Sequence, residues 1–136
     1  MIKKVDFTKY ADFVDGVTSH PSKDYQCFIE SVSALNGKGA NIERLLTASV
    51  GISAEGGEFM EIVKKIIFQG KPWNDDNREH LIIELGDVMW YVMQACMALD
   101  VSLDEVVEGN VDKLKKRYPG GDFDVHYSEN RKEGDR

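Results

Sequence analysis

Two short acidic motifs constrain the fold of this chain more than any other feature. The first, EGGE, contains Glu55 and Glu58, and the second, ELGD, contains Glu84 and Asp87. In each motif the carboxylates stand three residues apart, which places them on one face of an α-helix. If the two helices are neighbours, four carboxylates meet and repel one another unless a cation offsets their charge. Mg²⁺ and Mn²⁺ prefer oxygen ligands, so the pattern predicts a metal site between two helices.

The remainder of the chain shows helical periodicity and no strand-like alternation. Asn41 is a suitable N-cap for the helix with the first motif, and Ser102 with Glu105 forms a capping box for the last helix. We therefore expect an all-α bundle of four to five helices. Their expected ranges are residues 7–17, about 23–35, about 41–68, 76–99 and 103–118.

Length and composition indicate a soluble globular protein. The 136 residues are 42% hydrophobic and 30% charged, as is typical of one domain. We expect residues 1–121 to form a single helical domain and residues 122–136 to form a polar C-terminal tail. The net charge of −7 argues against nucleic-acid binding, which usually needs a basic surface.

The cysteines and the N-terminus indicate a cytoplasmic protein. Cys27 and Cys96 lack metal-ligand spacing, which is typical of a reducing compartment. The first residues contain no apolar stretch of signal-peptide length. The longest apolar run, residues 88–99, is interrupted by Gln94 and is too short to span a bilayer.

The same run predicts an oligomer. Residues 88–99 are apolar nearly all round, and such a helix has to be covered on every side. Four or five helices in one small chain provide too little cover. We therefore expect the bundle to be completed by assembly into a homodimer or homotetramer.

Each candidate site residue also has a purely structural interpretation. The motif carboxylates could form buried salt bridges with Lys64, Lys65 or Arg78 instead of binding a metal. Gly51, Gly56 and Gly57 indicate either tight helix packing or room for a ligand. Glu61 is a further ligand, a general base, or an ordinary i,i+4 partner of Lys65. Three basic residues of the last helix either complement the helix dipole or bind phosphate: Lys113, Lys116 and Arg117. Tyr91 either packs in the core or contacts a ligand. Three histidines have no zinc-like spacing and are expected to be structural or solvent-facing: His20, His80 and His126.

Three segments resemble the motifs of MazG-like nucleotide pyrophosphohydrolases. Residues 45–65 are similar to the first motif helix, residues 84–91 to the second motif, and residues 110–119 to the helix that follows. The resemblance covers roughly residues 41–123 and is greatest to the short single-domain members, including those of phages. Gly56 departs from the pattern, because many relatives carry a larger residue there.

The resemblance implies an all-α oligomer that hydrolyses nucleoside triphosphates, with Mg²⁺ or Mn²⁺, to the monophosphate and pyrophosphate. It implies the host cytoplasm as the location if the protein is phage-encoded. The implied metal ligands and catalytic residues are Glu55, Glu58, Glu84 and Asp87. Implied phosphate or nucleotide contacts are Lys65, Asn110, Lys113, Arg117 and Tyr118, and Tyr91 is a further candidate.

Two other functions stay open at this point. One is a related pyrophosphohydrolase with a narrower substrate: dUTP, dCTP, a phosphoribosyl nucleotide or a guanosine alarmone. The other is a non-catalytic helical module that binds metal or promotes oligomerisation.

Overall fold

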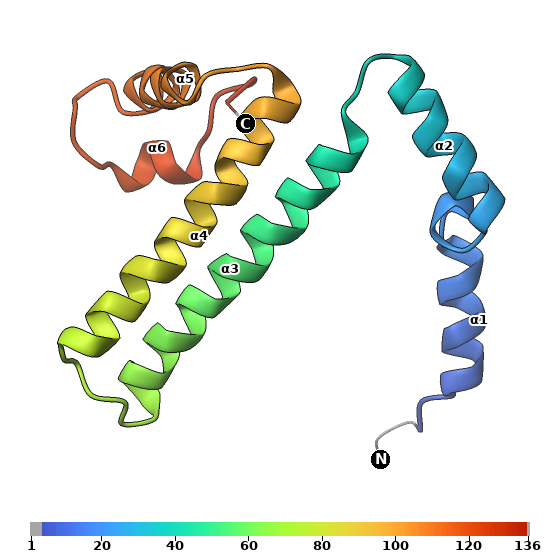
Figure 1. Cartoon of the computed structure of the whole chain (residues 1–136), viewed down its shortest axis with the longest axis horizontal. Helices are drawn as coiled ribbons and strands as arrows, with labels where there is room; N and C mark the ends of the chain where they lie inside the picture. Colours follow the sequence, from blue (N-terminus) through green and yellow to red (C-terminus); the bar gives the residue numbers. More distant parts are fainter. Residues whose placement is uncertain (1–3, 136) are drawn as a thin grey trace. The chain divides into compact units, whose positions relative to one another are not determined.

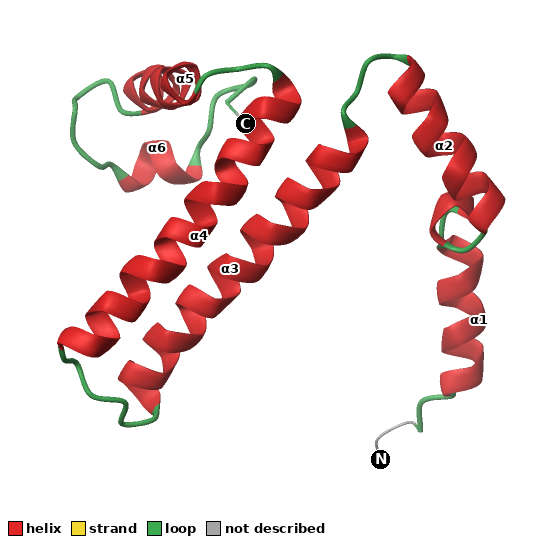
Figure 2. Cartoon of the chain, in the orientation of Figure 1, coloured by secondary structure: helices red, strands yellow, loops and turns green. Residues whose placement is uncertain are grey.

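The computed structural model describes residues 4–135, and these form helices and loops without a strand (Figure 2). The all-α prediction is therefore confirmed. Six α-helices and one 3₁₀ turn follow one another along the described residues (Figure 1): α1 (Phe7–Val17), η1 (His20–Ser22), α2 (Tyr25–Gly37), α3 (Ile42–Phe68), α4 (Asp75–Leu99), α5 (Leu103–Arg117) and α6 (Val125–Glu129). The first five α-helices match the expected ranges within two residues, while α6 was not expected.

Side-chain caps explain most of the helix boundaries. Asp24 caps α2 by accepting the amide of Cys27, and Asn74 caps α4 by accepting the amide of Asn77. Ser102 and Glu105 form the expected capping box at the start of α5. Asp124 accepts the amide of His126 and so starts α6 within the segment expected to be a polar tail. Short polar caps of this kind satisfy amides that have no partner in the first turn.

The chain divides into two compact units, residues 1–42 and residues 43–136. The first unit contains α1, η1 and α2, and Lys23 ties it together through an ion pair of 3.2 Å with Asp15. Neither α1 nor α2 contains a buried residue. The proposed division into residues 1–121 and 122–136 stays a prediction.

The second unit is built on the antiparallel pair α3 and α4, which lie side by side (Figure 1). Arg44 at the start of α3 donates to Gln94 near the end of α4, at 3.0 Å. Further along, Gly51 faces Tyr91 so closely that an added Cβ would lie 2.0 Å from the ring. Ala48 and Cys96 are buried in the same section. Since this register pairs early α3 with late α4, it also brings the middle of one helix to the middle of the other.

Helix α4 requires a correction to the membrane argument. The helix has 25 residues and contains an 18-residue window with a mean hydropathy of 1.3, so by length and composition alone it is long and apolar enough to cross a membrane. The shortness of the 88–99 run therefore does not exclude a span. Glu84 and Asp87 oppose one, because an aspartate at the centre of a membrane helix costs about 2.5–3.5 kcal/mol. The absence of a membrane partner stays a prediction.

Candidate metal centre

The antiparallel register brings the two acidic motifs together. Glu55, Glu58 and Glu84 each present a carboxylate oxygen within 4.8 Å of the other two. Glu55 and Glu58 lie on one face of α3 because they are three residues apart, and Glu84 reaches them from α4. Asp87 also acts on this group, because its charge contributes to the raised pKa of Glu55.

The three carboxylates differ in exposure. Glu84 is buried at 6% exposure, Glu55 is half-buried and Glu58 is exposed. Loss of water around Glu55 raises the pKa of its carboxyl, and the negative charges of Glu58, Asp87 and Glu84 raise it further. The site is therefore short of positive charge in the absence of a cation. Carboxylates that are crowded and partly desolvated favour either protonation or a bound cation.

The alternative to a metal site, in which basic side chains neutralise the carboxylates through buried salt bridges, is not what the described residues show. Among residues 4–135, no ion pair joins the three clustered glutamates to Lys64, Lys65 or Arg78. Lys65 instead pairs with Glu61 at 2.8 Å. Its hydrogen bond and charge lower the pKa of the Glu61 carboxyl. This confirms the expected i,i+4 partnership, while the role of Lys65 in nucleotide binding stays a prediction.

His80 is the residue that the sequence interpretation missed. Its Nε2 lies 2.9 Å from Oε1 of the buried Glu84, one helical turn away on α4. The i,i+4 spacing of His80 and Glu84 is a signal for this contact in the sequence, whereas zinc-like spacing concerns the histidines alone. A ring nitrogen that donates to a ligating carboxylate fixes the orientation of that carboxylate. His80 is therefore in position to orient Glu84.

The backbone around the cluster leaves room for a ligand. No heavy atom of the described residues outside the local backbone lies within 4 Å of a Cβ built at Gly56, Gly57 or Gly86. Three oxygen donors beside open space suit a hard divalent cation, which keeps part of its water shell. The donor set therefore fits a divalent metal ion.

The candidate nucleotide contacts are spread over several places. Tyr91 is half-buried, packs over Gly51 and meets Trp90 edge to face at 4.8 Å between ring centroids. Asn110 is exposed on α5. Tyr118 meets Phe123 at 5.8 Å. Their contacts with a nucleotide stay predictions.

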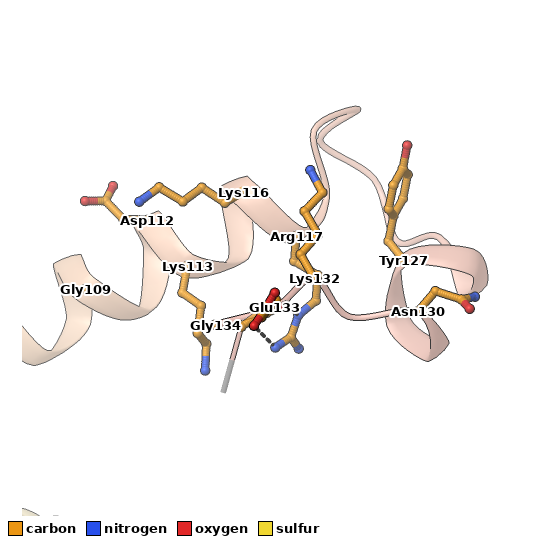
Figure 3. A pocket seen from close by; sticks show the side chains of 11 residues that line it. Gly109, Asp112, Lys113, Lys116, Arg117, Tyr127, Asn130, Lys132, Glu133 and Gly134 are labelled. Carbon is orange, nitrogen blue, oxygen red and sulfur yellow. Dashed lines mark hydrogen bonds and ion pairs between the residues drawn. The ribbon is translucent and has the colours of Figure 1, made fainter.

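The basic residues of α5 line a pocket of their own. Lys113, Lys116 and Arg117 border a cavity of about 510 Å³ between α5, α6 and the last residues of the described chain (Figure 3). None of the four motif carboxylates lines this cavity. Glu84 lies fifteen residues before the end of α4, about 22 Å along the helix axis, and α5 follows that end. The structure thus brings the carboxylates together without bringing the α5 cations to them.

Comparison with known proteins identifies the family of the chain. The MazG nucleotide pyrophosphohydrolase domain matches residues 44–121, which include both acidic motifs. The Gene 37 protein of Mycobacterium phage L5 is 42% identical over 82 residues, which cover 60% of this chain and 72% of the phage protein. This relative agrees with the expected likeness to short phage-type members. No solved structure matches the chain. The match over more than half of the residues shows that the chain belongs to the MazG nucleotide pyrophosphohydrolase family.

Proposed function

We propose that this protein hydrolyses nucleoside or deoxynucleoside triphosphates between the α and β phosphates, releasing the monophosphate and pyrophosphate. The observation that carries the proposal is the meeting of Glu55, Glu58 and Glu84 within 4.8 Å across α3 and α4. Family membership supports the reaction class. We further propose Mg²⁺ as the metal, with Mn²⁺ as a substitute, because both prefer carboxylate oxygen.

In this proposal the acidic residues hold the metal ion and supply the negative charge around it. Glu55, Glu58 and Glu84 hold the cation, and Asp87 completes the negative environment that attracts it. His80 keeps the Glu84 carboxylate in one orientation. A bound divalent ion supplies charge neutralisation for the polyphosphate and makes water a better nucleophile at neutral pH. Open space beside Gly56 and Gly57 admits the substrate.

The decisive experiment is pyrophosphate release from a panel of the common NTPs and dNTPs with Mg²⁺, with and without EDTA. We expect release that EDTA abolishes. The panel includes dUTP, dCTP, a phosphoribosyl nucleotide and an alarmone, so that a narrow specificity becomes visible. Metal binding without release from any substrate would contradict the proposal and identify a non-catalytic module.

We also propose that Lys113 and Arg117 contact substrate phosphates. They stand four residues apart on one face of α5, as a two-point grip on a polyphosphate requires, and Lys116 is offset from them. Lys113→Ala is expected to raise KM or lower kcat, and Lys116→Ala to have a smaller effect. Equal and small effects of both variants would assign these residues to the helix dipole instead.

The active assembly is proposed to be a homodimer or homotetramer in the cytoplasm. Trp90 is 56% exposed, and two large apolar side chains with similar exposure follow it on the same side of α4: Met93 and Met97. A second copy is the proposed cover for this surface, since monomers rarely expose contiguous apolar patches. Another copy could also bring α5 cations to the carboxylates, which lie about 22 Å from the end of α4. Light scattering that gives 15.4 kDa at micromolar concentration would contradict this assembly.

A further inference from the structure

Helix α5 makes a two-point polar contact with the last residue that the structure describes. The Arg117 guanidinium donates from Nε to Asp135 Oδ2 at 2.7 Å and from Nη2 to Asp135 Oδ1 at 2.6 Å. The two side chains are only 12% and 14% exposed. A two-point pair of an arginine and a carboxylate is among the stronger polar contacts in proteins. Arg117 is therefore occupied, although the proposed reaction needs it for phosphate.

The contact lies inside the α5 pocket. Lys113, Lys116 and Lys132 line the same cavity as Arg117, and the ring of Tyr127 lines it as well. Figure 3 shows the Arg117 side chain turned from the end of α5 toward the returning chain, where a dashed line marks its contact. Lys113 also acts on this carboxylate, because its charge contributes to the lowered pKa of Asp135. A cavity of about 510 Å³ has the size of a small-molecule site.

The segment that carries Asp135 is separate from the family domain. The family match ends at residue 121, so Arg117 lies inside the matched region and Asp135 lies outside it. After α6 ends at Glu129, residues 130–135 contain no helix or strand. A turn joins the Asp135 amide to the Lys132 carbonyl at 3.0 Å. Opening of this segment therefore breaks the Arg117–Asp135 contact but no backbone hydrogen bond within helices α3, α4 or α5.

We propose that residues 130–135 act as an intramolecular competitor, in which the Asp135 carboxylate occupies Arg117 until a phosphate-bearing ligand displaces it. A guanidinium binds carboxylate and phosphate with the same two-point geometry, so one group can replace the other. A polyphosphate carries several negative charges to the lysines of the pocket, whereas Asp135 carries one. The inference rests on the proposed phosphate role of Arg117 and adds a regulation of that contact.

Competition of this kind has a measurable size. The apparent affinity of the pocket equals the affinity of the open form multiplied by the fraction of molecules in which Asp135 has left Arg117. If about a tenth of the molecules are open, removal of the competitor tightens binding about tenfold. The change has to come from the two-point contact itself. If the gain came only from the loss of one negative charge near the pocket, replacing any neighbouring carboxylate would give the same gain.

Isothermal titration of inorganic triphosphate separates these effects. EDTA is present, so that no metal at Glu55, Glu58 and Glu84 contributes. We expect Asp135→Asn to bind about tenfold more tightly than the wild type. Glu133→Gln is the matched control, because Glu133 lines the same pocket and the variant loses the same charge. We expect the control to change affinity less than about twofold.

Two results would overturn the proposal. One is an equal gain in Asp135→Asn and Glu133→Gln, and the other is no gain, or no binding, in Asp135→Asn. Adding Arg117→Ala to Asp135→Asn is expected to cancel the gain, and a gain that survives would also refute the role of Arg117. In the wild type, saturating triphosphate is expected to speed hydrogen exchange in residues 130–135. Unchanged or slower exchange would contradict displacement without recourse to any variant.

A separate assay distinguishes this inference from the proposed function. Pyrophosphate release with Mg²⁺ is measured for the same variants. Tighter triphosphate binding by Asp135→Asn without turnover of any nucleotide by the wild type would support the competitor and refute the pyrophosphohydrolase. Turnover by the wild type with no change of affinity in Asp135→Asn would refute the competitor and leave the pyrophosphohydrolase standing.

Discussion

Along the α3–α4 pair, a packed section from Arg44 to Gly51 adjoins a carboxylate section from Glu55 to Glu58, and the two are built on opposite uses of glycine. In the packed section Gly51 lets the Tyr91 ring lie against the α3 backbone. In the carboxylate section Gly56 has open space around it. One glycine serves close approach of two helices, and the other leaves room beside charged groups. The interpretation as tight helix packing is therefore confirmed at Gly51, while room for a ligand at Gly56 stays a prediction.

The two sections also differ in their electrostatics. In the packed section Arg44 reaches a neutral partner, Gln94, across the helices. In the carboxylate section negative groups face one another, and the pKa of Glu55 rises because it is desolvated and surrounded by like charge. The packed section is held by contacts within the chain, whereas in the carboxylate section the proposed cation would offset the like charges. Helix packing and the proposed metal site therefore occupy adjacent turns of the same helices.

The largest expected effect is on activity. Glu58→Gln or Asp87→Asn is expected to abolish pyrophosphate release, because each removes a negative charge needed to hold the metal. Without metal, the thermal stability should stay level or rise, since repulsion is relieved. Glu43→Gln, an exposed α3 residue outside the cluster, serves as the control. Turnover near the wild-type level in either site variant would remove that residue from the metal site.

The next largest effect concerns His80. Replacement by alanine is expected to weaken apparent Mg²⁺ affinity about 10–100-fold, because the buried Glu84 loses the group that orients it. Activity measured against Mg²⁺ concentration gives this value, and excess Mg²⁺ should restore kcat. The control is His20→Ala in the first unit. If both variants need the same Mg²⁺ concentration, His80 does not position the ligand.

Two glycine variants test whether the packed section and the carboxylate section differ in packing, and the measured quantity is the free energy of unfolding. Gly51→Ala is expected to destabilise the protein by about 1–3 kcal/mol, because the new Cβ would overlap the Tyr91 ring. Gly56→Ala is expected to stabilise it by about 0.5–1 kcal/mol, because alanine favours an open helix position. Urea denaturation measures both values. The two sections would not differ in packing if both variants shifted the midpoint in the same direction.

The smallest expected effect is a pH dependence that Glu55 contributes. Its carboxyl pKa in the folded protein lies above the ordinary value of 4.5. The folded state therefore binds this proton more tightly than the unfolded state does, and the resulting stability is lost as pH rises through the raised value. In EDTA, Glu55→Gln should be more stable relative to the wild type at about pH 7 than at about pH 4. A difference that does not change with pH, measured by urea denaturation, would contradict the raised pKa.

The amino-acid sequence by itself determined the helices and the pairing of carboxylates within each motif. Apolar periodicity and capping residues such as Ser102 and Glu105 act over a few residues, so they can be recognised without knowledge of the rest of the chain. The spacing of Glu55 and Glu58 likewise determines a shared face on any helix. Even the missed His80–Glu84 contact has a local signal, since it joins neighbouring turns of one helix.

Only the tertiary structure decided which distant residues meet. The contact of Gly51 with Tyr91 depends on the register of α3 against α4, and local spacing says nothing about that register. The same register determines that Glu84 reaches Glu55, while it leaves Lys113 in a different pocket. The pairing of Arg117 with Asp135 depends on the path of the chain after α5. Such contacts result from packing and chain path, which no single stretch of residues specifies.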